Sequence, residues 1–309
     1  MKFGKVDNPE EIDFTLPADH PATEQVFNTF GGNVKKGLPK IYVGCAKWNK
    51  KDLKNFYPKG VKDELSYYST QFNCIEMNAS FYRIFPPEQF AKWKEKTPDD
   101  FMFFPKLPKQ ISHYRQLNDV EEVVDRFLNS AVELEDKLGM MFLQMNERFK
   151  PNRFEKLVNF IENWPKDLPL TIELRHTDWY NDEAVAKELY MLLESRGISN
   201  TLTDTAGRRD LMHMRMTNPT PFVRYTGSNH SSDYTRLDDW VERIATWIEQ
   251  GMDELYFFVH QNMELESPLL AAHFIKQLNS KLGYDLHVPI KPKVERKTVK
   301  KTNKKKKTK

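Results

Sequence analysis

The chain has 309 residues, a formal net charge of +3, two cysteines and an aromatic share of 13%. That aromatic share argues against a disordered body, and no apolar run approaches the roughly 18 residues that a membrane helix needs. Cys45 and Cys74 are too few for a disulfide framework. We therefore expect a cytoplasmic protein with no membrane partner.

Residues 1–38 are polar and are interrupted by Pro17, Pro21 and the pair Gly31 and Gly32. We interpret them as a polar N-terminal extension that lies over the body. The body, residues 39–290, has about the usual length of a (β/α)₈ barrel, roughly 250 residues. A chain of this length can bury a large core in a single domain.

From residue 39 onward, short apolar runs alternate with amphipathic stretches. The runs are IYVG (41–44), CIEM (74–77), FMFF (101–104), MMFLQ (140–144), LTIEL (170–174), ISNTLT (198–203), PFVRYT (221–226) and LYFFVH (255–260). Apolar residues recur at helical spacing within 120–134, 154–164, 189–193 and 237–248. This alternation indicates parallel strands, and eight repeats predict an α/β protein with a TIM-like (β/α)₈ barrel.

An open, doubly wound sheet is the alternative architecture. Such a sheet usually has a Gly-rich first turn, and the segment GCAKWNKKD after the first run does not match one. Residues 205–220 carry no helical stripe, so we predict a long loop there.

Positive charge is concentrated in residues 291–309, KPKVERKTVKKTNKKKKTK, which carry a net charge of +10 and so leave −7 for the rest of the chain. We predict a disordered Lys-rich tail, because this composition cannot pack a core. Such a tail either makes weak contacts with nucleic-acid phosphates or is simply solvated. An acidic body is not a uniformly basic nucleic-acid-binding domain.

Polar side chains stand at or just after the end of every predicted strand, where a parallel barrel forms its site. They are Lys47, Trp48, Glu76, Asn78, Lys106, Gln144, Glu173, Arg175, His176, Asp204, Arg224, His260 and Asn262. Period two places Glu76 and Asn78 on one strand face, and Glu173 and Arg175 on another. This clustering predicts a binding or catalytic site at the strand ends.

Two interpretations of these charges stay open. Glu76 and Glu173, with Asp204, are candidate catalytic groups, because a lone carboxylate in an apolar strand is costly to bury; alternatively, they form structural ion pairs. Lys47, Lys106, Arg83, Arg175 and Arg224 suit a phosphate-binding lining, or each arginine pairs with a carboxylate. The aromatic residues Trp48, Tyr82 and Trp179 either stack on a ligand ring or anchor their loops.

No cofactor or metal signature is present: the sequence has no H-E-x-x-H, C-x-x-C, P-loop or G-x-S-x-G motif. His113, His176 and His260 are possible ligands only if the fold brings them together. We therefore predict neither a metal nor a cofactor.

Several segments, in order, resemble the domain-of-unknown-function-72 family, also called YecE-like. They are VGCAKW (43–48), IEMNASFYR (75–83), FPKLPKQISHYRQL (104–117), FLQM (142–145), IELRHTDWY (172–180), LTDT (202–205), FVRYTG (222–227) and FFVHQN (257–262). The resemblance implies a TIM-like barrel. It also implies a shared pocket that contains Glu76, Asn78, Phe81, Tyr82, Arg83, Lys106, Gln144, Glu173, Arg175, His176, Trp179, Asp204 and Arg224.

The family brings no established activity, and its barrels resemble those of endonuclease IV and sugar isomerases. This chain departs from the family pattern at Cys45 and Ala46, at Tyr225 and Thr226, after Gln144, and at His260. Hydroxyls and a histidine of the family pattern are thereby replaced; if those groups perform chemistry in the family, this chain is altered or inactive in it.

Two hypotheses follow. The first is a hydrolase or related enzyme acting on a phosphorylated sugar, nucleotide or nucleic-acid fragment, with Glu76 or Glu173 as acid or base. The second is a non-catalytic barrel that binds an anionic ligand or nucleic acid, with help from the tail. Carboxylates facing each other across an open pocket favour the first hypothesis, and carboxylates locked to arginines favour the second. The oligomeric state is left open.

Overall fold

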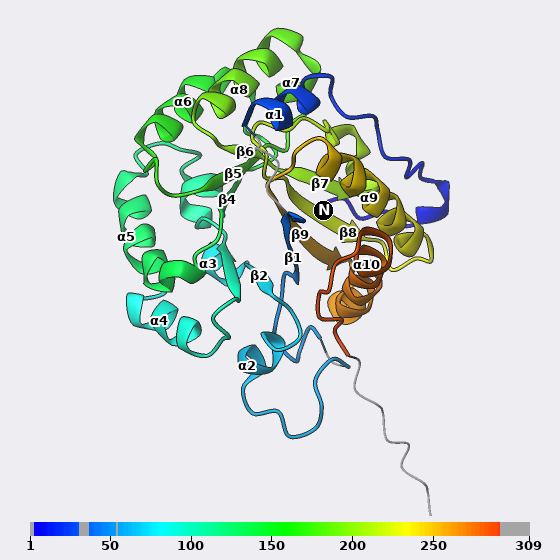
Figure 1. Ribbon diagram of the computed structural model, residues 1–309. Helices are drawn as coiled ribbons and strands as arrows, with labels where there is room; N and C mark the ends of the chain where they lie inside the picture. The colour runs from blue at the N-terminus through cyan, green and yellow to red at the C-terminus, as the bar shows by residue number, and fades with distance from the viewer. Residues whose placement is uncertain (1–2, 31–36, 54, 291–309) are drawn as a thin grey trace, which may run out of the picture.

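The computed structural model describes residues 3–30, 37–53 and 55–290. The predicted Lys-rich tail, 291–309, lies outside these ranges. In Figure 1 the helices lie around the outside and the strands lie toward the middle. The described strands are β1 (Lys40–Cys45), β2 (Cys74–Met77), β3 (Met102–Pro105), β4 (Met141–Gln144), β5 (Leu170–Glu173), β6 (Ser199–Asn200), β7 (Leu202–Thr205), β8 (Phe222–Gly227) and β9 (Glu254–Gln261).

Helices fill most of the connections between these strands. The α-helices of the described ranges are α1 (Ala22–Phe30), α2 (Glu64–Tyr68), α3 (Ala79–Tyr82), α4 (Pro87–Glu95), α5 (Glu121–Ala131), α6 (Phe154–Asn163), α7 (Asp178–Asn181), α8 (Glu183–Ser195), α9 (Ser232–Glu249) and α10 (Ser267–Leu282). The 3₁₀-helices are η1 (Pro9–Glu11), η3 (Val132–Lys137), η4 (Pro151–Arg153), η5 (Ala206–Leu211) and η6 (Glu264–Glu266), and η2 (Gln110–Tyr114) is a π-helix. The four predicted helical stripes are confirmed as α5, α6, α8 and α9.

Each of the eight predicted apolar runs overlaps a strand. The sixth run is split into β6 and β7 at Thr201, whose N–H donates to the carbonyl of Ile172 at 2.9 Å. The connection after β7 contains the short turn η5 and no α-helix, so the predicted loop at 205–220 is confirmed.

The strands form two parallel sheets. One has the order β3-β2-β1-β9-β8-β7, so β1 pairs with both its successor and the last strand, and the other has the order β4-β5-β6. An isolated parallel bridge between Lys106 and Phe142 links them. The α/β class with parallel strands is therefore confirmed. The hydrogen bonds of the described residues form no closed sheet, so the (β/α)₈ barrel stays a prediction.

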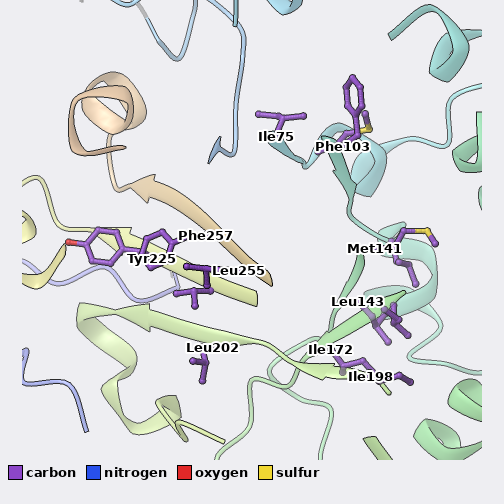
Figure 2. Packing of buried hydrophobic residues seen from close by; sticks show 14 of the residues in the cluster. Ile75, Phe103, Met141, Leu143, Ile172, Ile198, Leu202, Tyr225, Leu255 and Phe257 are labelled. Atoms are coloured by element: carbon purple, nitrogen blue, oxygen red, sulfur yellow. The ribbon is translucent and has the colours of Figure 1, made fainter. Parts of the chain in front are cut away.

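Alternate residues of the strands enter two different apolar clusters. The larger cluster packs strands against helices, and Figure 2 shows some of its members, among them Ile75, Phe103, Met141 and Ile172. The smaller cluster contains the neighbouring positions on the opposite strand face, namely Cys74, Phe104, Met140, Phe142, Phe222 and Phe258. Because side chains alternate along a strand, the face of the smaller cluster also carries the polar residues nearer the strand ends.

The N-terminal residues pack on the body. Helix α1 buries Val26 and Phe27, and the ring of Phe27 lies 6.1 Å from that of Trp247 on α9. The indole N–H of Trp247 donates to Asp19 at 3.0 Å, and Asp19 also forms an ion pair with Arg243. The division into extension, body and tail stays a prediction.

No helix within the described ranges has the length and apolar character needed to cross a bilayer.

Candidate functional site

Five polar residues of the candidate site follow members of the smaller apolar cluster by two positions on the same strand faces. Glu76 follows Cys74, Lys106 follows Phe104, Gln144 follows Phe142, Arg224 follows Phe222 and His260 follows Phe258. Parallel strands end at the same edge, so these side chains converge there. We call Glu76, Asn78, Lys106, Gln144, Glu173, Arg175, Arg224 and His260 the mouth network.

Arg224 is the centre of the mouth network. Its Nε and Nη2 donate to the two carboxylate oxygens of Glu76 at 2.9 and 3.0 Å. Its Nη1 donates to Oε2 of Glu173 at 2.6 Å. One guanidinium therefore holds two buried carboxylates from β2 and β5, and the bidentate contact sets its orientation.

A second chain of contacts runs along the other side of Glu173. The Nε of Arg175 donates to Oε1 of Glu173, and Gln144 Nε2 donates to Oε2 at 2.9 Å. Gln144 Oε1 accepts from Lys106 Nζ at 2.8 Å. Gln144 therefore links an ammonium to a carboxylate, which orients its amide.

The Glu76 side carries a histidine and an amide. Oε2 of Glu76 lies 3.0 Å from His260 Nε2, and Oε1 accepts from Asn78 Nδ2 at 2.7 Å. The other ring nitrogen of His260 lies 3.6 Å from Oε1 of Glu264. The sequence placed His260 among the polar residues at the strand ends, but assigned it no catalytic or substrate-binding role.

These ion pairs set the charges of the mouth network. Burial alone raises the pKa of Glu173, but Arg175 and Arg224 bring it down to about 2. The pKa of Glu76 is likewise held well below its usual range, because Arg224 and His260 outweigh the effect of burial. Burial lowers and Glu76 raises the pKa of His260, and the net shift is upward. Both carboxylates are therefore ionised at neutral pH.

Lys106 differs from the other cations of the network. It is 6% exposed, and no carboxylate of the described residues lies within ion-pair distance of its Nζ. The Nζ lies 4.3 Å from the ring centroid of Phe81 and 5.3 Å from that of Phe142. Burial, with Arg224 and Arg175 nearby, lowers the pKa of Lys106 well below its usual range. The carboxylates of Glu76 and Glu173 already balance the guanidiniums of Arg175 and Arg224. A positive charge on Lys106 therefore has no counter-ion in the mouth network.

His113, from η2, is close to the same group of cations. Burial, then Lys106 and Arg175, lowers the pKa of His113 to about 4, and its ring lies 5.0 Å from that of Phe81. The imidazole of His113 is therefore neutral at pH 7. It has one hydrogen-bond donor and one acceptor, and it lies beside the mouth network.

Asp204 belongs to a separate cluster. Its carboxylate accepts from Arg236 Nη2 at 2.7 Å and from the indole N–H of Trp240 at 2.8 Å, and it also pairs with Arg209. Arg236 and Trp240 lie on α9. The side chain of Asp204 thus extends from β7 to partners on α9. Glu76 and Glu173, by contrast, both contact Arg224.

Several predicted ligand-binding residues make local contacts. Lys47 pairs with Asp52 at 3.1 Å, and Trp48 packs edge-on against Trp93 at 5.9 Å between ring centroids. Trp179 is fully buried and donates its indole N–H to the carbonyl of Phe149 at 2.7 Å. His176 Nδ1 lies 3.4 Å from Oδ2 of Asp178. The backbone N–H of Asn262 donates to the carbonyl of Gly227 at 3.0 Å. Such contacts are typical of residues that shape the loops around a site.

Tyr82 and Arg83 lie in a groove beside the mouth network. Tyr82 is 70% exposed, and the Arg83 guanidinium lies 5.1 Å from the ring centroid of Phe85. Phe81 lines the same groove and also contacts Lys106, so the two regions are adjacent.

The N-terminal segment reaches the mouth network. The ring centroid of Phe3 lies 3.6 Å from the guanidinium carbon of Arg175. The Gly4 carbonyl accepts from the N–H of Gly207 at 2.9 Å and from Oγ1 of Thr205 at 3.2 Å. Phe3 was missed, because nothing in a polar N-terminal lead indicates which loop it covers.

No group of three or more His, Cys, Asp or Glu side chains in the described ranges is arranged to hold a metal ion. Cys45 and Cys74 are both buried, and burial raises the pKa of each thiol well above its usual value. These two thiols are therefore weak candidates for a nucleophile.

Comparison with known proteins identifies the family. A family model described as "Protein of unknown function DUF72" matches residues 42–293. The chain belongs to the DUF72 family. It is 27% identical to the UPF0759 protein YecE of Escherichia coli over 274 residues, which are 82% of this chain and 97% of that protein. It is also 27% identical to the UPF0759 protein YunF of Bacillus subtilis over 150 residues, which are 46% of this chain and 52% of YunF.

Solved structures of DUF72 proteins have the same fold. A DUF72 family protein from Enterococcus faecalis aligns with a TM-score of 0.63 at 22% identity, over 78% of this chain and 98% of that one. A DUF72 family protein from Thermotoga maritima aligns with a TM-score of 0.63 at 24% identity, over 78% of this chain and 100% of that one. The family resemblance found in the sequence is therefore confirmed.

Proposed function

We propose that this DUF72 protein binds a small phosphate-bearing ligand at the mouth network without transforming it. The observation that carries the proposal is Lys106, a buried amine with no carboxylate partner among the described residues. A buried ammonium without a counter-ion is costly, so an anion that binds beside it is favoured. Arg175 adds a guanidinium, since only its Nε is engaged by Glu173 in the described contacts.

The locked carboxylates support binding over catalysis. Glu76 and Glu173 both contact Arg224, and the pKa of Glu173 is about 2. A carboxylate this acidic is a weak general base at neutral pH. This is the arrangement expected of a site that orients a ligand.

A hydrolase acting on a phosphorylated sugar, nucleotide or nucleic-acid fragment is the second candidate. The observation in its favour is His260, placed between Glu76 and Glu264 with a raised pKa. A histidine held in this way is suited to give a proton to a leaving group. Glu173→Gln and His260→Gln are the variants that test it, on a panel of phosphodiesters and sugar phosphates.

The binding proposal is tested by calorimetry with inorganic phosphate, glucose 6-phosphate and adenosine monophosphate. We expect at least one to bind wild type, and Lys106→Met to lose at least tenfold in affinity. Exposed Lys166 provides the matched control, Lys166→Met, which should bind as wild type does. Binding that is equal in Lys106→Met and wild type, or absent from wild type, contradicts the proposal. Turnover that Glu173→Gln abolishes supports the hydrolase instead.

The Lys-rich tail is a further element of the proposed partners. Its ten lysines and one arginine would add weak phosphate contacts with nucleic acid, which fall steeply with salt.

A further inference from the structure

A groove with a volume of about 630 Å³ lies beside the mouth network. Its walls are the segment 81–87, which follows β2, and the segment 108–110, which follows β3, together with Arg126 and Ser130 of α5. Both loops follow strand ends, so the groove opens on the same side as the mouth network. Its size falls within the roughly 300–1,000 Å³ of ordinary ligand sites.

Among the described residues, the groove is lined by three cations and by no carboxylate. They are Arg83, Lys109 and Arg126. None of the three has an Asp or Glu within ion-pair distance in the described part of the chain; Arg126 contacts only the neutral amide of Gln110, at 3.4 Å. The charge of the groove is therefore positive and not neutralised by the protein.

Two exposed tyrosines flank Lys109: Tyr82, which lines the groove, and Tyr114, which lies next to it. Tyr82 is 70% exposed and Tyr114 is 67% exposed. The Nζ of Lys109 lies 5.8 Å from the ring centroid of Tyr82 and 5.2 Å from that of Tyr114. One ammonium thus lies close to two open aromatic faces, an arrangement that suits a ligand with both rings and negative charge.

We propose that this aromatic-basic groove binds single-stranded nucleic acid. The phosphates contact Arg83, Lys109 and Arg126, while bases stack on Tyr82 and Tyr114. An acidic peptide would use the cations but carries a flat ring only where it has an aromatic residue, whereas every nucleotide pairs a phosphate with a flat base. The inference does not depend on the ligand of the mouth network, since Lys106 and Arg175 take no part in it.

The net charge of the rest of the chain bears on where a nucleic acid can bind. Outside residues 291–309 the chain carries a net charge of −7, so the body as a whole repels a polyanion. Attraction must then come from local cations, such as those of the groove, or from the Lys-rich tail. The two sources differ in chemistry, because only the groove offers stacking faces.

The test measures binding of a fluorescent 15-nucleotide oligothymidine or oligouridine by anisotropy, in the full-length protein and across a salt series. We expect Tyr82→Ala and Tyr114→Ala each to weaken binding about tenfold. The double variant Arg83→Gln with Lys109→Gln should reduce the slope of log affinity against log salt by about 1.4, that is, about 0.7 per phosphate contact. The DNA and RNA arms show which strand the groove prefers.

Matched variants separate the groove from the tail. Replacing Lys304, Lys305, Lys306 and Lys307 by Gln removes more charge than the groove variant does, but no ring. If only this tail variant loses affinity, the tail binds the oligonucleotide and the proposal is overturned. Tyr234→Ala, at a 39% exposed tyrosine on α9, should bind as wild type does.

Two further ligands complete the test. Heparin supplies negative charge without stacking bases, so the tyrosine variants should bind it as wild type does; an equal loss for heparin and oligonucleotide overturns the stacking argument. Vesicles containing phosphatidylserine test a membrane partner, and tyrosine-dependent vesicle binding without oligonucleotide binding overturns the proposal. Circular dichroism of each variant confirms that a loss of binding is not a loss of fold.

Discussion

The mouth network and the aromatic-basic groove use the same kinds of cation in opposite ways. In the mouth network, Arg224 is 7% exposed and is surrounded by two carboxylates. In the groove, Arg83, Lys109 and Arg126 lie along an open surface whose lining, in the described part of the chain, contains no carboxylate. Burial explains the difference, because a desolvated charge needs a partner within the protein, whereas a hydrated charge does not. Cations that fold the protein and cations that are free for a ligand can therefore be told apart by their partners.

The largest effect should come from Arg224→Met. Removing this guanidinium leaves Glu76 and Glu173 buried without their main partner, so we expect a loss of about 3–5 kcal/mol in the free energy of unfolding. Urea denaturation at pH 7 measures it, with Arg126→Met in the groove wall as the control that removes an arginine without stranding a carboxylate. If the two variants lose equal stability, the contrast between the regions is wrong. Should Arg224→Met not fold, the triple variant with Glu76→Gln and Glu173→Gln is expected to recover folding.

Glu173→Gln should have the next largest effect, and that effect depends on pH. The folded-state pKa of about 2 lies below the ordinary value for Glu, so ionised Glu173 stabilises the fold above about pH 4.3. This stabilisation, on the order of 3 kcal/mol, is lost as the pH falls from about 4.3 to about 2. Urea denaturation at pH 7, 4 and 3 should show the gap between wild type and Glu173→Gln shrinking. Exposed Glu188→Gln should show no such trend, and a gap independent of pH contradicts the ion-pair account.

Gly4→Ala should expose part of the mouth network at a smaller cost. Gly4 has φ +70°, and a Cβ there would lie 2.1 Å from Oγ1 of Thr205, so residues 3 and 4 must leave their site. We expect faster hydrogen exchange at the amide of Gly207 and faster modification of Arg175 by phenylglyoxal. Gly60→Ala is the control, because φ is +87° there with no atom within 4 Å of the added carbon. Unchanged exchange at Gly207 would mean that the segment does not cover the network.

The smallest effects should be those of the groove cations on stability. Arg83→Ala and Lys109→Ala should each change the free energy of unfolding by less than about 0.5 kcal/mol, since neither removes a buried partner. Thermal and urea denaturation both measure this. A loss above about 1 kcal/mol for either variant would show that the cation has a structural partner and would weaken its assignment to a ligand.

Much of the candidate site was predictable from local patterns. Apolar runs of strand length located every strand of the described ranges because most strand residues are buried, and β6 and β7 together made up one predicted run. Period two placed Glu76 with Asn78 and Glu173 with Arg175, and both pairs are in direct contact. Of the three carboxylates grouped as catalytic candidates, only Glu76 and Glu173 share a partner.

Sequence by itself thus determined the order of strands and helices, the family, and the end of the sheets where polar residues meet. Only the tertiary structure decided which charges are paired. Arg224 contacts Glu76, which is 148 positions away in the chain. Asp204 pairs with Arg236 of α9, and the ring of Phe3 packs on Arg175. Strand periodicity acts between neighbours in the chain, whereas the partner of a buried charge depends on which strands and helices pack together and on how each loop is directed. For the same reason, the sequence could not show that Lys106 and the groove cations lack a carboxylate partner among the described residues. Only the tertiary structure shows this.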